Sequence, residues 1–458
     1  PWAYKRIQQG DRTCSADQAL HGEAPSVLKM VRDNSHYVPK VADPLDPVTF
    51  VHRIKAAVFM ACQWQDEQTG GHCADLAQDF SGTRRKWFTF TNGAHVDSLD
   101  PATVERWYDF LSLFVAHRAP AVNAGLVDFA APLFYTQGMG IQGVTLPPDP
   151  IAQIPTYRAA LAAYERLPQV RVLFDNGAGV APNGTVTPGD PYAGFERSFS
   201  RFPIPGTVAQ TWYFGAGGSL AEEPDPAPET DTFSWDPRAL PATDYASSST
   251  EAGGLWGNAA SWAWNWAQNP PGTALAYVSA PLTQDTTVIG GGAVRLWLEA
   301  STANVGLQAT VSEVRPDGTE TFVQNGWAQA DERELAPGST PLEPALNLRA
   351  GALRPLPRGR FVEVTIPLYY EGHVYRAGSR IRVTLSAPGG TQPTWAFAPL
   401  SPAGTATVSV RLSASTPSQL VLPVVPGVRV PTALPPCPSL RNEPCRPYVP
   451  FADRTSAS

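Results

Sequence analysis

Two short apolar runs near the start of this 458-residue chain constrain its fold more than any other feature. The runs are Ile54–Cys62 and Lys86–Thr91, and polar or turn-forming residues follow each of them. Runs of this length are typical of strands buried on both faces, as in a parallel sheet covered by helices. An amphipathic helix is expected over Pro101–Phe114, where large apolar side chains recur at helical spacing and proline stands in the first turn. This order of strands and helices predicts the last part of a parallel α/β sheet.

Two strands do not make a stable sheet of this kind, because both faces and the outer edge would lack partners. We expect the other strands on sequence before residue 1, since nothing after residue 120 alternates strands with helices in the required way. The chain starts with Pro1 rather than methionine and shows no signal-peptide pattern, which agrees with a start partway through a gene product.

From about residue 167 the pattern changes to short strands separated by turn residues. Proline and glycine are abundant, at 47 and 38 residues, whereas charged residues make up only 16% of the chain. This balance favours many strands and turns over long charged helices. We therefore expect a β-sandwich of the jelly-roll type. Its predicted strands include 170–174, 210–214, 293–298, 307–312, 361–366 and 380–385.

Charge and hydropathy exclude some classes of partner. The net charge is −7 and no run of lysine or arginine occurs, so we expect no nucleic-acid partner. No apolar run approaches the 18 residues of a membrane span. Cys62 with Cys73, and Cys437 with Cys445, are grouped as two local disulfides of a secreted protein would be, and Cys14 is left over. Free thiols in a cytoplasmic enzyme are the alternative, since no cysteine spacing decides between the two.

A titratable residue follows each of the two α/β strands. Asp66 comes shortly after the first strand, and His95 comes shortly after the second. Loops at the carboxyl ends of neighbouring parallel strands meet at one edge of the sheet, so these two side chains are expected on the same edge. An Asp presented to a His is the orienting pair of a nucleophilic triad. Solvated loop residues with no catalytic role are the alternative, because any α/β protein has such residues.

These residues carry a resemblance to a known family. The segments Ile54–Asp66 and Thr91–His95 resemble the acid and histidine segments of the cocaine esterase and X-Pro dipeptidyl-peptidase (CocE/NonD) hydrolases. Downstream segments look like serial landmarks of the family's C-terminal jelly roll: Gln210–Phe214, Phe233–Pro237, Tyr277–Thr286 and Val311–Gly318. The resemblance implies that Asp66 is the triad acid and His95 the triad base. It also implies substrates such as acyl esters, amino-acid esters, β-lactam side chains or N-terminal dipeptides, and no metal or organic cofactor.

One departure from the family pattern shapes the functional hypothesis. The chain contains no G-x-S-x-G elbow, the motif that carries the nucleophilic serine in α/β-hydrolases. We therefore expect a serine hydrolase in which this chain supplies Asp66 and His95, while the serine lies on N-terminal hydrolase sequence, either missing here or held as a companion chain. The alternative is a non-catalytic carbohydrate- or surface-binding β-sandwich protein with a degenerate hydrolase remnant.

The resemblance and the strand pattern together predict an α/β plus all-β chain in five parts. These are a remnant of a helical cap and its connection at 1–52, the last strands and helices of an α/β-hydrolase domain at 53–120, an insertion or linker at 121–166, a jelly-roll β-sandwich at 167–435, and a proline-rich tail with a local disulfide at 436–458.

Two weaker candidates were weighed against structural roles. His72 beside Cys73 has the residue types of a metal site, although a disulfide and a solvated imidazole are the simpler interpretation. A tryptophan cluster offers rings that could stack on a sugar or an acyl group, although tryptophan more often packs in a core. The cluster comprises Trp256, Trp262, Trp264 and Trp266.

Overall fold

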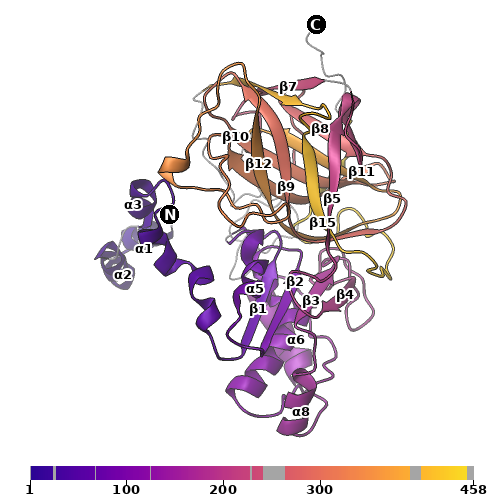
Figure 1. Ribbon diagram of the computed structural model, residues 1–458. Coiled ribbons are helices and arrows are strands. Elements are labelled where there is room, and N and C mark those ends of the chain that lie inside the picture. Colours follow the sequence, from indigo (N-terminus) through magenta and orange to yellow (C-terminus); the bar gives the residue numbers. More distant parts are fainter. Residues whose placement is uncertain are drawn as a thin grey trace.

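The structure, a computed structural model, contains two sheets and an arm of helices (Figure 1). It describes residues 2–23, 27–67, 69–123, 125–226, 229–240, 264–391 and 404–450. Among these residues no helix has the length and hydropathy needed to cross a membrane.

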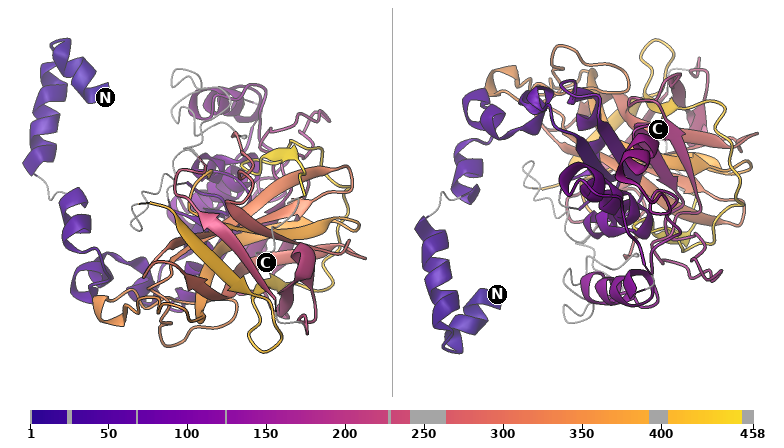
Figure 2. Two further views of the ribbon diagram at one scale, coloured as in Figure 1. Left: turned by 90° about the horizontal axis from the view of Figure 1, so that it is seen from above. Right: turned by 90° about the horizontal axis from the view of Figure 1, so that it is seen from below.

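The N-terminal helices form an arm that extends away from the two sheets (Figure 2). They are α1 (Trp2–Gln8), α2 (Arg12–Glu23), α3 (Val27–Asp33) and α4 (Pro39–Ala42). The arm joins the body at Tyr37, whose backbone N–H donates to the Leu348 carbonyl at 2.8 Å and whose ring packs under the Arg349 guanidinium. The role of residues 1–52 as part of a cap stays a prediction.

The smaller sheet has four described strands in the order β1-β2-β3-β4. β1 to β3 are parallel to one another, and β4 is antiparallel to β3. The strands are β1 (Val58–Gln63), β2 (Lys86–Thr91), β3 (Val170–Phe174) and β4 (Phe195–Phe199). The helices of this part are α5 (Leu76–Asp79), α6 (Pro101–Phe110), α7 (Ala131–Gly138) and α8 (Tyr157–Tyr164), with the π-helical turns η6 (Leu111–Val115) and η7 (Leu126–Ala130). The 3-10 turns along the chain are η1 (Asp43–Leu45), η2 (Pro47–Thr49), η3 (Val51–Arg53), η4 (Gly71–Ala74), η5 (His95–Leu99), η8 (Ala216–Gly218) and η10 (Ala350–Ala352).

The placement of β3 corrects one prediction. The strand pattern predicts an α/β sheet that ends before residue 120 and places 170–174 in the sandwich, but β3 pairs in parallel with β2. Four of its five residues are buried, which is the burial pattern of a central strand. The turn residues that follow it, Asp175-Asn176-Gly177, led to the sandwich assignment. They instead connect β3 to the antiparallel strand β4.

The larger sheet closes on itself. Among the described residues, nine strands form a ring in the order β12-β11-β10-β13-β8-β6-β5-β15-β9, and β9 pairs with β12 to close it. The ring strands are β5 (Val208–Gly215), β6 (Ser219–Ala221), β8 (Ala274–Ser279), β9 (Thr286–Ala300), β10 (Gly306–Val314), β11 (Thr319–Gln329), β12 (Val362–Tyr375), β13 (Arg380–Ser386) and β15 (Gln419–Val424). β14 (Ala406–Arg411) extends the sheet from β9 and is followed by β7 (Thr230–Trp235), while β16 (Cys445–Pro447) pairs with β11.

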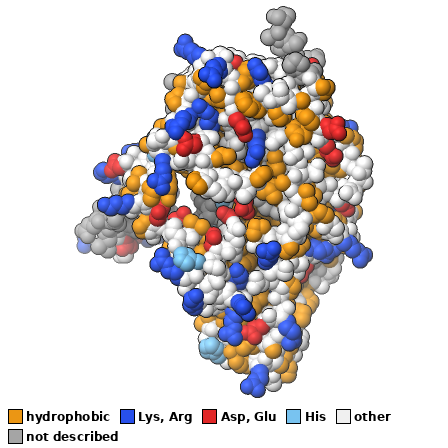
Figure 3. Space-filling view, in the orientation of Figure 1, with side chains coloured by type: hydrophobic (Ala, Val, Ile, Leu, Met, Phe, Trp, Pro, Cys, Tyr) orange, Lys and Arg blue, Asp and Glu red, His pale blue; other side chains and the backbone are white. Residues whose placement is uncertain are grey.

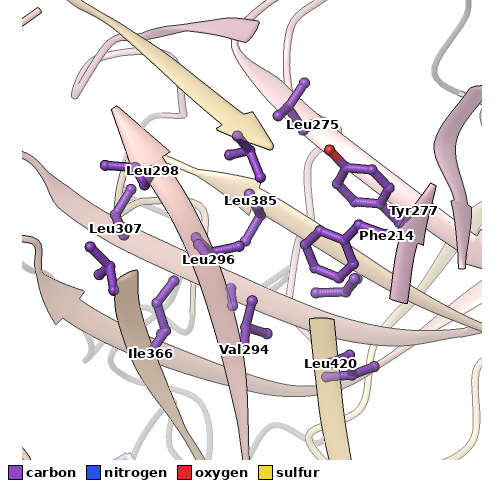
Figure 4. Close-up of a cluster of buried hydrophobic side chains, with 14 of the residues drawn as sticks. Phe214, Leu275, Tyr277, Val294, Leu296, Leu298, Leu307, Ile366, Leu385 and Leu420 are labelled. Carbon is purple, nitrogen blue, oxygen red and sulfur yellow. The ribbon is translucent and has the colours of Figure 1, made fainter. Parts of the chain in front are cut away.

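Inward-facing apolar side chains fill this closed sheet (Figure 4). Phe214 from β5 stacks on Tyr277 from β8 with ring centroids 4.1 Å apart. Closure gives most strands two neighbours and so leaves few unpaired edges. The five remaining predicted strands lie in or overlap β5, β9, β10, β12 and β13. The largely β character is thus established, and the jelly-roll connectivity stays a prediction.

One apolar cluster joins the two sheets. Trp64, directly after β1, is fully buried and lies 5.2 Å from the ring of Phe90 in β2. The same cluster includes Ile289, Tyr370 and other side chains of the closed sheet. Shared burial of this kind fixes the position of the smaller sheet against the larger one, because separating them would expose these side chains to water.

Candidate active site

Asp66 and His95 lie against each other beyond the ends of two neighbouring strands. Gln63 of β1 and Thr91 of β2 are the last register partners of this parallel pair, and the two site residues follow within four positions. His95 Nδ1 lies 2.8 Å from Asp66 Oδ2. The Asp66 side chain is only 4% exposed, whereas that of His95 is 31% exposed. A buried carboxylate therefore orients an imidazole that solvent can still reach.

Both members of the pair are held by their own loops. The Thr69 backbone N–H donates to Asp66 Oδ1 at 2.9 Å, which leaves Oδ2 for His95. The His95 backbone N–H donates to Glu67 Oε2 at 2.8 Å. Burial raises the pKa of Glu67, although the His95 N–H acts in the opposite direction. Glu67 was not predicted as a site residue, and its function here is to position the His95 main chain.

The turn between β2 and His95 requires glycine. Gly93 has a φ of +140°, a region that side chains rarely adopt. A Cβ atom at this position would collide with the carboxylate of Asp97. That carboxylate accepts the Ala94 backbone N–H at 2.8 Å, so the tight approach also satisfies a buried donor next to His95.

The C-terminal tail reaches the same loops from more than 340 positions along the chain. The buried Arg441 side chain forms an ion pair with Asp97. The Asn442 side-chain amide donates to the Gln65 carbonyl at 2.9 Å, and Gln65 Nε2 donates to Glu443 Oε1 at 3.1 Å. Three consecutive tail residues thus bind the loops on either side of the Asp66–His95 pair. We call these three residues the tail clamp.

The closed sheet contacts the acid loop as well. Gln65 Nε2 donates to the Val323 carbonyl of β11 at 2.9 Å. Gln324, the next residue of β11, donates through its side-chain amide to the Trp64 carbonyl at 2.7 Å. These contacts fix the two residues that precede Asp66. They were not predictable from the sequence, because glutamine at a strand position gives no signal of a partner about 260 positions away.

Two disulfides frame the site. Cys62 in β1 is bonded to Cys73 in η4, which closes the loop that contains Asp66. Cys437 is bonded to Cys445, which closes the loop that contains the tail clamp. Both pairings are those that the cysteine grouping predicted, and Cys14 belongs to neither. Each bond lowers the conformational freedom of a loop that contacts or contains a site residue.

A buried charge cluster lies behind the tail clamp. His373 Nε2 is 3.1 Å from Glu313 Oε2, and His373 Nδ1 is 3.2 Å from Glu443 Oε2. Burial by itself lowers the pKa of His373, but the charges and hydrogen bonds of Glu443 and Glu313 overcome it and raise the pKa to about 10. The imidazolium of His373 thus holds in place the same Glu443 that contacts the acid loop.

The weaker candidates have structural roles. Cys73 forms a disulfide, which confirms the simpler interpretation of this cysteine over a metal site, and His72 packs edge-on against Tyr369. Trp264 and Trp266 are 3% and 8% exposed and pack against a phenylalanine of β11, so they offer no open stacking surface. The other two tryptophans of that cluster, at 256 and 262, lie outside the described residues.

Surface charge gives no basic stripe on the face seen in Figure 3. Lysine and arginine side chains are scattered over both sheets there, and acidic side chains lie between them. A continuous basic surface is what a nucleic-acid backbone would need.

Comparison with known proteins identifies relatives that are hydrolases. Residues 162–395, just over half of the chain, match the model of the X-Pro dipeptidyl-peptidase C-terminal non-catalytic domain. Over 154 residues the chain is 27% identical to proteins named "Putative serine esterase" from Mycobacterium bovis and Mycobacterium tuberculosis; the match covers 33% of this chain and 24% of theirs.

Solved structures share the fold at low sequence identity. A CocE/NonD family hydrolase from Staphylococcus aureus superposes with a TM-score of 0.57 and 13% identity, covering 88% of this chain and 60% of that one. An α-amino acid ester hydrolase gives a TM-score of 0.53 and 15% identity, covering 90% and 62%. An aminopeptidase from a marine-sediment Thaumarchaeota archaeon gives 0.51 and 14%, covering 82% and 56%. The chain therefore spans about three fifths of the length of these enzymes.

Proposed function

This chain belongs to the family of the X-Pro dipeptidyl-peptidase C-terminal non-catalytic domain, which its residues 162–395 match. We propose that the part of the chain before this match provides the acid and base of a Ser-His-Asp hydrolase. The observation that carries the proposal is the 2.8 Å contact between His95 Nδ1 and the buried Asp66 carboxylate. It lies at the carboxyl edge of a parallel sheet, where α/β enzymes gather their reacting groups. The serine would lie on hydrolase sequence outside residues 1–458.

The proposed reaction is acyl transfer. Asp66 accepts a hydrogen bond from the Nδ1–H of His95, which holds that proton on Nδ1 and leaves Nε2 free to take the serine proton as the hydroxyl oxygen attacks an ester or amide carbonyl. His95 then gives that proton to the departing alcohol or amine. A water molecule, activated by His95 in the same way, releases the acyl group. Asp66 stabilises the imidazolium that forms in both steps.

The β1 edge of the smaller sheet favours the proposal that further hydrolase sequence pairs with this chain. Among the described strands β1 pairs with β2 alone, so its other edge carries unpaired backbone donors and acceptors (Figure 1). The first four residues of β1 are only partly buried, although β2 is buried almost throughout. A further parallel strand added at this edge would complete β1, and its carboxyl end would come close to the Asp66 loop.

The substrates and the location are proposed on the same basis. The relatives are named as esterases, an amino acid ester hydrolase and an aminopeptidase, so we propose a small ester, amide or short peptide as the substrate. The two disulfides agree with an exported protein, because such bonds persist in oxidising compartments.

A fluorophosphonate probe tests the proposal on the natively purified protein. Intact-mass spectrometry under denaturing conditions should find one adduct, on sequence outside residues 1–458. Asp66→Asn and His95→Gln should slow labelling by at least a hundredfold, since replacing the triad aspartate by asparagine lowers kcat by about 10⁴ in a serine protease. Two variants serve as matched controls. Asp75→Asn changes the residue directly after η4, and His52→Gln changes an exposed residue of η3. Both should be labelled at the wild-type rate.

Two results would decide against the proposal. Equal labelling of the wild type, Asp66→Asn and His95→Gln would exclude the pair from catalysis. An unlabelled protein under all conditions would favour the non-catalytic alternative, a β-domain binding protein that retains part of a hydrolase sheet.

A further inference from the structure

Three buried carboxylates gather at a place that the proposed reaction does not use. Glu105 and Asp109 lie four residues apart on α6, and Asp149 comes from the loop between α7 and α8. One oxygen from each lies within 4.8 Å of the other two, and all three residues are buried. Among the described residues this is the one group of three or more His, Cys, Asp or Glu side chains with the spacing of metal ligands.

The carboxylate of Asp109 has no N–H or O–H donor beside it, and the carboxyl group of Asp149 is its polar neighbour. Asp109 is 0% exposed, and neither its Oδ1 nor its Oδ2 accepts a hydrogen bond from such a donor. Asp149 uses Oδ1 to accept the backbone N–H groups of Ile151 and Ala152 at 2.8 and 3.0 Å, but its Oδ2 is also without a donor. An ionised carboxylate buried without a partner is strongly unfavourable. The Asp109 carboxylate and Asp149 Oδ2 therefore need a proton or a cation to offset their charge.

The arginines nearby offset only part of this negative charge. Arg171 Nη1 lies 3.9 Å from Glu105 Oε2, but the Arg171 guanidinium already donates to Glu196 and to the Ala102 carbonyl. Arg106 has its guanidinium over the ring of Tyr164. Neither arginine is recorded in a hydrogen bond or ion pair with Asp109 or Asp149.

We propose that Glu105, Asp109 and Asp149 bind a divalent cation of the hard, oxygen-preferring type, for which Ca²⁺ is the probe. Ca²⁺ binds oxygen at about 2.3–2.6 Å, so two oxygens on opposite sides of the ion stand about 4.6–5.2 Å apart. Oxygens that all lie within 4.8 Å of one another are close enough to bind the same ion. Carboxylates are the ligands that Ca²⁺ prefers, and the three here carry more negative charge than the ion needs.

The alternative occupant is a proton shared between carboxyl groups. Burial and the neighbouring charge of Asp149 raise the pKa of Asp109 to about 9, so the cluster without a cation would hold Asp109 in its neutral form. Cation binding and proton binding then compete for the same oxygens. Asp109→Asn distinguishes the two occupants. The amide imitates a protonated carboxyl, so the variant should fold, but it is a poor calcium ligand, so calcium affinity should fall.

Calcium titration of the full chain tests the proposal and needs no hydrolase activity. Protein treated with EDTA and dialysed is titrated with CaCl₂ by calorimetry, and its unfolding temperature is measured against calcium concentration. We expect one ion per chain and an unfolding temperature that rises with the logarithm of the calcium concentration once binding saturates. Asp109→Asn should fold and bind at least tenfold more weakly, whereas Asp128→Asn, an exposed acid on the nearby turn η7, should bind as the wild type does.

Glu105→Gln is the second variant and should also bind at least tenfold more weakly. The proposal is overturned if the wild type shows neither calorimetric binding nor a calcium-dependent unfolding temperature at millimolar CaCl₂. It is overturned equally if Asp109→Asn and Glu105→Gln bind as tightly as the wild type. A negative result would leave the proposed hydrolase function untouched, since the Asp66–His95 pair does not include these residues.

Discussion

Raising the pH above 8 should destabilise the fold through one buried histidine. His373 lies between Glu313 and Glu443, and its folded-state pKa is raised to about 10 from an ordinary value of 6.5. A raised histidine pKa contributes stability that is complete below pH 6.5 and is lost as the pH rises through the folded pKa. Integrating between these pKa values gives a loss of roughly 2 kcal/mol in unfolding free energy from pH 8 to pH 10.

The comparison between the wild type and His373→Gln isolates this effect. Chemical denaturation is measured at pH 8, 9 and 10, with both proteins in a Cys14→Ser background so that no thiolate attacks the disulfides at alkaline pH. His373→Gln should be less stable at pH 8, because Glu313 and Glu443 are then buried without their cation. The difference between the two proteins should shrink as the pH rises. A difference that stays constant from pH 8 to pH 10 would refute a charged His373 in the folded protein.

Three further changes test the packing around the site. Cys437→Ser should release the tail clamp. Amide exchange in residues 63–67 and 92–97 should then become faster, and fluorophosphonate labelling slower. Unchanged exchange would show that the disulfide is not needed to hold these loops. Trp64→Ala should cost about 3–5 kcal/mol in denaturation, because it opens a cavity against Phe90; a cost under 1 kcal/mol would show that the site collapses freely. Gly177→Ala should lower the unfolding temperature, since φ there is +108° and the new Cβ would collide with the Ser439 carbonyl; an unchanged unfolding temperature would mean that the tail can move aside at no cost.

The parts of the site that follow local rules were predictable from the sequence. The ends of two parallel strands meet at one sheet edge, and this rule predicts Asp66 and His95 on the same edge, where the structure has them in contact. Their pairing as acid and base was implied by the family resemblance. The prediction for β3 was wrong, because it rests on the turn Asp175-Asn176-Gly177, which is also typical of a sandwich. The burial of β3 is close to that of β2, with which it shares the smaller sheet. Turn residues indicate where a strand ends, but they do not tell which sheet the strand joins.

The contacts that hold the site in place were beyond sequence reasoning for a physical reason. Arg441, Asn442 and Glu443 stand in a proline-rich tail between two cysteines, a context that predicts a small disulfide loop and nothing about its partners. Their hydrogen bonds to the loops of Asp66 and His95 join residues 344 to 378 positions apart, and such pairings depend on the whole fold. A single sequence gives no periodicity or spacing from which these partners could be read.

These long-range contacts give the β domain a part in positioning the proposed acid and base. Residues 162–395 match a domain described as non-catalytic, but that domain contacts the loop of Asp66. The closed sheet contains neither Asp66 nor His95, yet β11 holds Trp64 and Gln65 through the Val323 carbonyl and the Gln324 side chain. An imidazole displaced by as little as 1 Å from its nucleophile loses most of its effect, because acyl transfer depends on a precise approach. If Asp66 is the acid of the proposed hydrolase, the β domain sets its position through the two residues that precede it. Loss of these contacts should then lower the labelling rate without any change to Asp66 or His95.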